Sequence, residues 1–354
     1  MAKPLDKHKM TQRRIAELAG VSQATVSLVL NGRADTTGRI PAKTRDRVLA
    51  VIRDTTYVAD PAARRLAGVG NKIIGVFTYE PAFPHESEDF YTPLLRGIES
   101  EAEVLGCDLL IFTSAPVTDG RRRIFHQNSR LGLADGCLLL GSTMDDEELT
   151  RLVDSELPFV AIGRRGAAAG RVPYVGLDYV TATAELVQRA LELGHRDFYY
   201  AGLPGEAESI IDRQSGFLNG LLTSGARSRL RQVTDDTLSA TWQEIEMTRP
   251  SVVFVGDAAH AQVLHQLAID AGLVVPRDLS FVVLNEPSRA RDQTVDFARL
   301  SPPRARLGSQ AVRLLNNILS PDEQPVGFER QILLDCALVP GATLSQPATS
   351  GRAL

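Results

Sequence analysis

The chain of 354 residues is longer than one ordinary domain, and its 44% hydrophobic and 23% charged residues are typical of a folded globular protein. It has no apolar run of roughly 20 residues and no secretory signal, which excludes a membrane protein, argues against export and predicts a cytoplasmic protein. The net charge of −4 is uneven, with 14 Lys and Arg against 6 Asp and Glu in residues 1–72 and 25 against 37 in the remainder. A basic first fifth favours a polyanionic partner such as nucleic acid, although a solvated basic face would give the same pattern.

Three short helices are predicted between Thr11 and Tyr57, because apolar residues recur there at three- and four-residue spacing. Gly20 permits a tight turn after the first helix, Asn31-Gly32 ends the second, and Pro41 opens the third. Small residues in the first two helices allow the close crossing that a helix-turn-helix needs. The residues expected to face inward are Ile15, Ala16, Ala19, Val21, Val26, Val29, Leu30, Val48, Leu49 and Ile52.

The second of these helices is expected to read DNA, with Ser22 placed to cap it. Outward side chains near its start would meet base edges in the major groove, namely Gln23, Ala24, Thr25 and Leu28. Phosphates would be held by Thr11, Ser22, Ser27 and Asn31. A small helical domain that binds protein is the alternative, but the Ala-Gly-Val-Ser turn and the basic charge favour DNA.

The segment YVADPAARRLAG predicts a further short helix, with Asp60 as its cap and Pro61 in its first turn. A helix of about eight residues is marginal alone and needs a partner to fold. Leu66 is an apolar residue beside arginines, a combination suited to insertion into a minor groove while the arginines hold phosphate. Ala63, Arg64 and Leu66 are therefore predicted DNA contacts, and ordinary packing of Leu66 is the alternative.

From Ile73 onward, short apolar strands alternate with helices, which predicts parallel sheets covered on both faces. The expected strands are IIGVF, DLLIF, GCLLLG, PFVAIG, DFYYAG, SVVFVG and LSFVVL. The expected helices include Leu94 to Leu105, Ala182 to Leu193, His260 to Ala271 and Arg306 to Leu319. About 265 residues is generous for one doubly wound sheet, so two similar lobes with a cleft between them are predicted.

These elements predict an all-α helix-turn-helix head and an α/β core of two doubly wound parallel-sheet lobes. The head takes residues 1–59, a hinge helix and linker take 60–72, and the core takes 73–340. The N-lobe is expected at about 73–172 and 301–324, and the C-lobe at about 173–300 and 325–340. Residues 341–354 are rich in Pro, Gly, Ser and Thr and are predicted to be disordered.

The run from Thr11 to Gly68, followed by NKIIGVF, resembles the lactose-repressor (LacI/GalR) family of bacterial regulators. LGHRD, DRQSGFLNGL, VVFVGD and AGLVVPRDLSFVVLNE follow in that family's order and spacing, so the resemblance extends to about Pro340. It implies a nucleoid-associated repressor that needs no cofactor. The repressor would bind near-palindromic double-stranded operator DNA as a homodimer, with Leu66 of each paired hinge helix inserted at the operator centre. It also implies a core like periplasmic sugar-binding proteins, in which a small-molecule effector reorients the lobes and so orders or melts the hinge helices.

The resemblance also implies six effector contacts, namely Phe90, Tyr91, Arg164, Arg213, Asp257 and Asn285. Arg213 and Asp257 align with an arginine and an acid that hold effector hydroxyls, whereas Asn285 stands where many members carry aspartate. For Phe90 and Tyr91 the alternative is an aromatic residue of the core at a helix start. For Arg164 it is a surface ion pair at a strand end. A cleft with Arg, Asp and Asn fits sugars, sugar phosphates and nucleosides. The effector's identity and the operator sequence stay open. It is also open whether the protein represses or activates transcription, and whether the effector acts as an inducer or as a co-repressor.

The sequence departs from the family at several points. Leu28 stands where several members carry a base-contacting arginine, so this operator contact is expected to differ. DTTGR lengthens the loop before Pro41, and EPAFPHESED after the first strand is longer and more acidic than usual. No leucine heptad follows Pro340, which predicts a dimer rather than a tetramer.

Two rival functions share the core fold. An α/β enzyme is disfavoured because the sequence has no G-x-S-x-G elbow, phosphate loop or G-x-G-x-x-G after a strand. The six histidines are scattered, and the widely spaced Cys107, Cys137 and Cys336 form no zinc motif, so no metal is expected. A sugar-binding transport receptor would require a signal peptide and no basic head.

Overall fold

The structure is a computed structural model of the whole chain. It describes residues 10–31, 40–55, 57, 70–80, 91–118, 121–127, 129–155, 157–287, 294–325 and 327–348. The chain divides into two compact units, Met1–Lys72 and Ile73–Leu354, each of which is described by itself.

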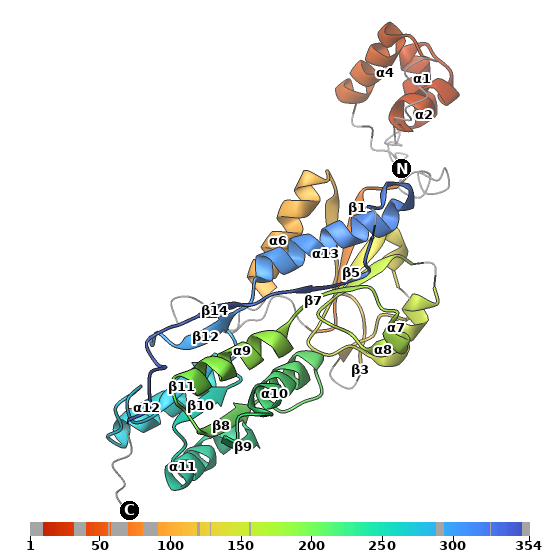
Figure 1. Cartoon of the computed structure of the whole chain (residues 1–354). Coiled ribbons are helices and arrows are strands. Elements are labelled where there is room, and N and C mark those ends of the chain that lie inside the picture. Colours follow the sequence, from red (N-terminus) through yellow and green to blue (C-terminus); the bar gives the residue numbers. More distant parts are fainter. Residues whose placement is uncertain are drawn as a thin grey trace, which may run out of the picture. The chain divides into compact units, whose positions relative to one another are not determined.

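The first unit contains the helices α1 (Gln12–Ala19), α2 (Gln23–Asn31) and α4 (Ala42–Asp54) around a small apolar core (Figure 1). Gly20 adopts φ 63° at the end of α1, which is the left-handed conformation that the predicted tight turn requires. The inward positions predicted for α1 and α2 all belong to this core. Leu49 does not, because it is 39% exposed; Val48, Val51 and Ile52 lie together on the buried face of α4, and Leu49 points away from it.

The second unit contains two six-stranded sheets, one in each lobe. The N-lobe sheet has the order β13-β7-β6-β5-β1-β2, and its strands are parallel. Its strands are β1 (Ile73–Thr78), β2 (Asp108–Phe112), β5 (Gly136–Leu140), β6 (Phe159–Ile162), β7 (Tyr174–Leu177) and β13 (Gln331–Leu334). Between β2 and β5 in the chain, the short strands β3 (Val117–Thr118) and β4 (Arg121–Arg122) pair with each other as a separate antiparallel ribbon.

The C-lobe sheet has the order β14-β12-β11-β10-β8-β9, and only its edge strand β14 is antiparallel to its neighbour. Its strands are β8 (Asp197–Gly202), β9 (Arg227–Gln232), β10 (Val252–Val255), β11 (Ser280–Val283), β12 (Ala298–Ser301) and β14 (Ala337–Val339). Each lobe therefore has the doubly wound parallel architecture that the alternating strands and helices predict.

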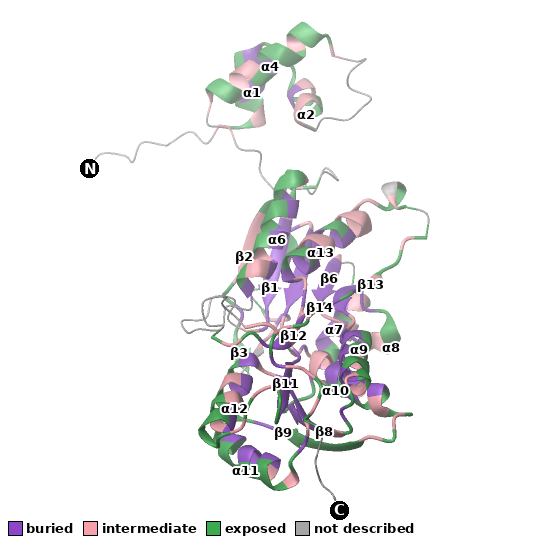
Figure 2. Ribbon diagram, turned by 60° about the vertical axis from the view of Figure 1, so that its left-hand side comes forward, coloured by how far each residue is buried: buried purple, intermediate pink, exposed green. Residues whose placement is uncertain are grey.

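Helices cover both faces of each sheet, and buried residues gather on the strands between them (Figure 2). The N-lobe helices are α6 (Tyr91–Val104), α7 (Asp146–Val153), α8 (Ala167–Gly170) and α13 (Arg304–Leu319). The C-lobe helices are α9 (Tyr179–Glu192), α10 (Glu208–Leu221), α11 (Leu238–Thr248) and α12 (Ala258–Asp270). Leu138 and Leu140 of β5 pack with α6 and α13, whereas Cys137 and Leu139 pack with α7 and α8, as the two-residue period of a strand requires.

The structure moves two predicted boundaries. The strands β7 and β13 pair with each other in the N-lobe sheet, so the N-lobe extends past 172 and includes residues 331–334, which the sequence analysis placed in the C-lobe. The prediction of disorder from residue 341 is wrong for residues 341–348. There Thr343 is buried, and its Oγ1 donates to Phe281 O at 2.7 Å and accepts from Ala298 N at 3.0 Å, so one side chain ties the tail to two neighbouring strands of the C-lobe.

Candidate effector cleft and DNA-reading helix

A cavity of about 570 Å³ lies between the two lobes. Part of its wall comes from residues just after strands, such as Ser142 after β5, Arg164 after β6 and Asp257 after β10, and helices such as α6 and α10 supply the rest. The carboxyl ends of parallel strands are where open α/β sheets bind ligands, because the loops there converge on a crevice. The cavity therefore occupies the position expected of a small-molecule site.

Two arginines after β6 cross from the N-lobe to helix α10 of the C-lobe. Arg164 donates from Nε and Nη2 to the two carboxylate oxygens of Asp212, at 2.7 and 2.6 Å. Arg165 donates from Nη1 to Glu208 at 2.8 Å and from Nη2 to Gly141 O at 2.6 Å. Glu208 and Asp212 are four residues apart and so share one face of α10. The hydrogen bonds to Asp212 raise the pKa of Arg164, while burial lowers the pKa of Arg165.

The C-lobe wall carries Arg213, Asp257 and Asn285, each fixed by its own contacts. The Arg213 guanidinium lies 3.6 Å from the centre of the Tyr179 ring, and its Nε donates to Leu284 O at 2.8 Å. Asp257 caps α12, because its Oδ1 accepts from two backbone N–H groups at the helix start, at 2.8 and 3.1 Å. Asn285 Oδ1 accepts from Arg304 at 3.1 Å. The capping bonds leave Asp257 Oδ2 available for a ligand, and the Asn285 amide keeps its N–H donors.

The N-lobe wall carries a hydrogen-bond network around Glu80, which is partly buried. Tyr91 donates its hydroxyl to Glu80 Oε1 at 2.6 Å, and Ser142 donates its backbone N–H and its hydroxyl to the same carboxylate at 2.7 and 3.1 Å. Burial and the neighbouring carboxylate raise the pKa of Tyr91, so its hydroxyl keeps the proton that it donates. Leu94, Leu140 and other leucines complete this wall.

Five of the six predicted effector residues line this cavity, namely Tyr91, Arg164, Arg213, Asp257 and Asn285. The sixth, Phe90, lies outside the described residues. The sequence analysis missed Glu80, Arg165 and Asp212. Arg165 follows the predicted Arg164, and Asp212 precedes the predicted Arg213, so a charged neighbour in the chain was the available signal.

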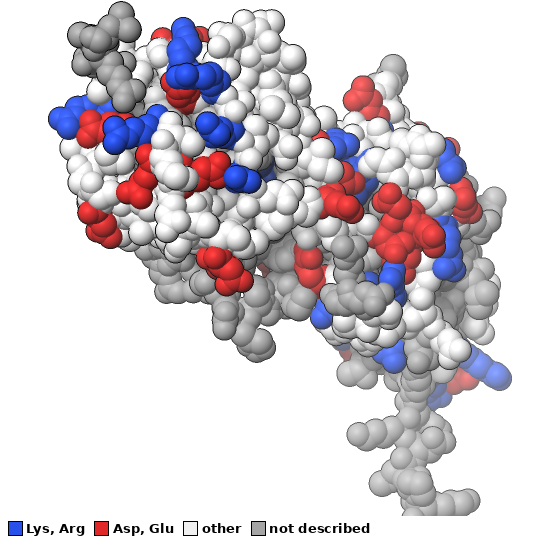
Figure 3. All heavy atoms as spheres, turned by 90° about the horizontal axis from the view of Figure 1, so that it is seen from below, with Lys and Arg blue, Asp and Glu red and all other residues white. Residues whose placement is uncertain are grey.

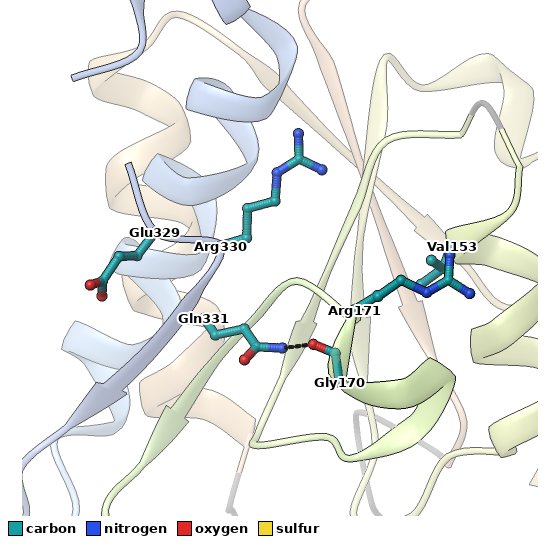
Figure 4. A pocket seen from close by; sticks show the side chains of 6 residues that line it. All are labelled: Val153, Gly170, Arg171, Glu329, Arg330 and Gln331. Atoms are coloured by element: carbon teal, nitrogen blue, oxygen red, sulfur yellow. Dashed lines mark hydrogen bonds between the residues drawn. The ribbon is translucent and has the colours of Figure 1, made fainter. Parts of the chain in front are cut away.

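A second hollow of about 680 Å³ lies at the amino ends of β7 and β13, where Arg171 and Arg330 flank it and Gln331 Nε2 donates to Gly170 O at 2.5 Å (Figure 4). It contains none of the predicted effector residues.

The described part of the chain also holds no group of three His, Cys, Asp or Glu side chains arranged for a metal ion. On the face drawn in Figure 3, acidic and basic side chains are intermixed. The inter-lobe cavity is therefore the candidate effector site.

In the first unit, the side chains predicted to read bases sit at the start of α2. Ser22 caps that helix, since its Oγ accepts from Thr25 N at 3.1 Å. Gln23, Ala24 and Leu28 are exposed, Leu28 to 38%, whereas Thr25, the fourth predicted reader, is partly buried. Exposed side chains at the N-terminal end of the second helix are the arrangement that a helix-turn-helix presents to the major groove.

The residues predicted to hold phosphate have mixed positions. Thr11 caps α1, with its Oγ1 accepting from Arg14 N at 3.3 Å, and Ser27 is partly buried. Asn31 is the last residue of α2. The predicted hinge contacts Ala63, Arg64 and Leu66 lie outside the described residues.

Two protein-family models match the chain. The model described as "Bacterial regulatory proteins, lacI family" matches residues 12–60, and the "Periplasmic binding protein-like domain" matches residues 187–344. The first covers the three helices of the head unit, and the second begins within α9 and extends past β14. None of the described helices is long and apolar enough to span a membrane.

Curated relatives align over most of the chain. Catabolite control protein A of Staphylococcus epidermidis is 27% identical over 87% of this chain and 92% of its own length. The HTH-type transcriptional regulator CelR of Thermobifida fusca is 28% identical over 90% of this chain and 95% of its own length. Head and core thus occur together, in the same order, in these regulators.

Solved structures share the fold. The lac repressor dimer bound to operator and the anti-inducer ONPF superposes with a TM-score of 0.72, at 20% identity, over 95% of this chain and 99% of that one. A complex of the transcriptional regulator CelR with cellobiose has a TM-score of 0.63, at 24% identity, over 94% and 99% of the two chains.

Proposed function

Since the chain belongs to the LacI family of DNA-binding transcriptional regulators, we propose that it represses transcription from a near-palindromic operator as a homodimer, under the control of a sugar-type effector. One observation carries this proposal. A single chain joins a helix-turn-helix with exposed side chains at the start of α2 to a core with a polar cavity between two lobes. A sugar-binding receptor or an α/β enzyme would have no use for the first unit.

We assign base contacts to Gln23, Ala24 and Leu28. A glutamine side chain can bridge the N6 and N7 positions of adenine, and alanine offers an apolar contact to a thymine methyl group. Leu28 supplies no hydrogen bond, so the base pair beside it is read by contact or by shape. Leu66 is proposed as the wedge in the minor groove at the operator centre.

The homodimer is supported by an apolar edge of the N-lobe sheet. The strand β2, with the sequence DLLIF, pairs with β1 on one side, and four of its five residues are only partly buried. An edge strand of this kind would promote aggregation unless a partner covered it. The lac repressor, which shares the fold, is a dimer in its operator complex.

The sugar-type effector is supported by the polar groups of the cleft and by the solved complex of a CelR transcriptional regulator with cellobiose, which shares the fold. Asp257 Oδ2 can accept from a hydroxyl, and the amide of Asn285 can donate to one. A hydroxyl both donates and accepts, so a site that offers both kinds of group suits a sugar.

The DNA part of the proposal is tested by selection of sequences from a random duplex library. We expect enrichment of a near-palindromic site that the protein binds as a dimer in sedimentation. The logarithm of the binding constant should fall by about 5 or more per tenfold rise in salt if roughly six phosphates are neutralised. Recovery of no preferred sequence would reject a regulator of this kind.

The effector part is tested with the selected operator. Adding sugars singly should shift operator affinity for at least one of them, and Arg213→Ala should abolish that shift. Since Arg213 also bonds the Leu284 carbonyl, thermal unfolding of the variant serves as the folding control. A retained response in a folded Arg213→Ala protein would remove Arg213 from the site.

A further inference from the structure

Two of the three described arginines that line the cleft are paired with carboxylates of the protein itself. Among the described residues that line it are three arginines and four carboxylates: Arg164, Arg165, Arg213, Glu80, Asp212, Asp257 and Glu286. Arg164 is bonded to Asp212 and Arg165 to Glu208. Of the described arginines that line the cleft, only Arg213 has no ion pair with a carboxylate. The other lining carboxylates are Glu80, Asp257 and Glu286.

We propose that Asp212 and Glu208 are specificity-determining residues that neutralise the cleft arginines, so that the cleft selects an uncharged, hydroxyl-rich ligand and rejects phosphate esters. This inference rests on the proposed function for the premise that the cleft takes an effector. It narrows the effector class from sugars and sugar phosphates to neutral sugars.

The geometry makes Asp212 difficult to displace from Arg164. The Asp212 side chain is 8% exposed, and both of its oxygens are engaged by the guanidinium in a two-pronged pair. A phosphate that took over Arg164 would leave this buried carboxylate without a counter-charge, and an unpaired buried charge is strongly unfavourable. Arg165 is still less accessible, with its side chain 4% exposed and its guanidinium bonded to Glu208 and to Gly141 O.

The remaining cation does not provide a phosphate site either. The Arg213 guanidinium is covered by the Tyr179 ring and bonded to the carbonyls of Leu284 and Ser209. Asp257 and Glu286 line the same cavity, so a dianion there would face more negative than positive charge. A neutral hydroxyl meets no such repulsion and can bond to Asp257 and Asn285.

The test measures thermal unfolding of the full-length protein in inorganic phosphate and in sodium chloride of equal ionic strength. The wild type should unfold at the same temperature in both. Asp212→Asn keeps the size of the side chain and removes its charge, so Arg164 becomes available to an anion. If the variant binds phosphate with a millimolar Kd, tens of millimolar phosphate should raise its Tm by roughly 2–4 °C.

Two further variants keep the result interpretable. Glu208→Gln should also gain a phosphate response, and it covers the case in which Asp212→Asn does not fold in sodium chloride. Glu192→Gln is the matched control, because it frees Arg189 from an exposed ion pair outside the cleft and should leave the phosphate response at zero. A sugar that binds the wild type should bind at least tenfold more tightly than its phosphate ester, and this ratio should shrink in Asp212→Asn.

Phosphate stabilisation of the wild type that is lost in Arg164→Ala would overturn the inference. So would a folded Asp212→Asn or Glu208→Gln that gains no response, or an equal gain in Glu192→Gln. The phosphate measurements involve neither DNA nor sugar. Failure to find an operator or a sugar response would therefore reject the proposed function and leave the charge assignment standing on its own data.

Discussion

The start of helix α2 and the cleft of the core use polar side chains in opposite ways. Gln23 is exposed at the start of α2, and Ser22 beside it bonds within its own turn. In the cleft, by contrast, Arg164 and Arg165 are already bonded to side chains of the other lobe. The first region presents groups to a partner that supplies the complementary charge. The second pairs two of its three described arginines internally and selects its ligand by the few groups that remain.

The largest difference between the two regions should appear when a cleft arginine is removed. Arg165→Ala should lower the free energy of unfolding by about 3–5 kcal/mol, because Glu208 and three backbone carbonyls lose a buried partner. Urea unfolding followed by circular dichroism measures this. The matched control is Arg171→Ala, whose ion pair with Asp154 is exposed and should contribute under about 1 kcal/mol. Equal losses in the two variants would mean that the inter-lobe pair is energetically an ordinary surface pair.

A substitution at an exposed reader should act on DNA binding and leave folding alone. Gln23→Ala should weaken binding to the selected operator by about 1–3 kcal/mol, since one bidentate base contact is lost. Binding to random duplex should be unchanged, because phosphate contacts carry no sequence information. Fluorescence anisotropy with both duplexes distinguishes these effects. A parallel loss on random DNA would show that Gln23 contacts the backbone instead.

The same contrast explains what could be predicted from the sequence. The seven apolar strands and the packing of α1 and α2 were predictable from local signals. The strands are short continuous apolar runs, and the helices have apolar residues at three- and four-residue spacing. The strand β9, with the sequence RSRLRQ, carries no apolar signal, since it is an edge strand whose six residues are all exposed. The tail at Thr343 was misjudged because its order comes from bonds to strands about 45 and 62 residues away.

The cleft was predictable only in part for the same reason. Arg213 and Asp257 stand in motifs that the family resemblance identifies, and both line the cavity. The partner of Arg164 is Asp212, 48 residues along the chain, and no local pattern connects the two. The pairing of this cleft arginine is therefore a property of the fold rather than of any one motif.

A smaller effect is expected where one residue serves both folding and DNA binding. Ser22→Ala should weaken α2 by about 1 kcal/mol, because the capping bond to Thr25 N is lost. Hydrogen exchange of the α2 amides in the full-length protein measures this change. Ser22→Asp should restore protection as a competent cap, yet its negative charge should still weaken DNA binding. Normal operator affinity in Ser22→Asp would remove Ser22 from the predicted phosphate contacts.

The smallest change in stability should come from Asp257→Asn, and it is the most informative about the cleft. Aspartate and asparagine are about equally good N-caps, so the bonds to Ala259 N and His260 N should persist and the free energy of unfolding should change by only a few tenths of a kcal/mol. Asp257→Ala removes the cap as well and should cost about 1 kcal/mol. If Oδ2 accepts from an effector hydroxyl, both variants should lose the sugar response of operator binding, although only one loses stability. A normal response in Asp257→Asn would mean that Asp257 shapes the cleft as the cap of α12 and makes no charged contact with the effector.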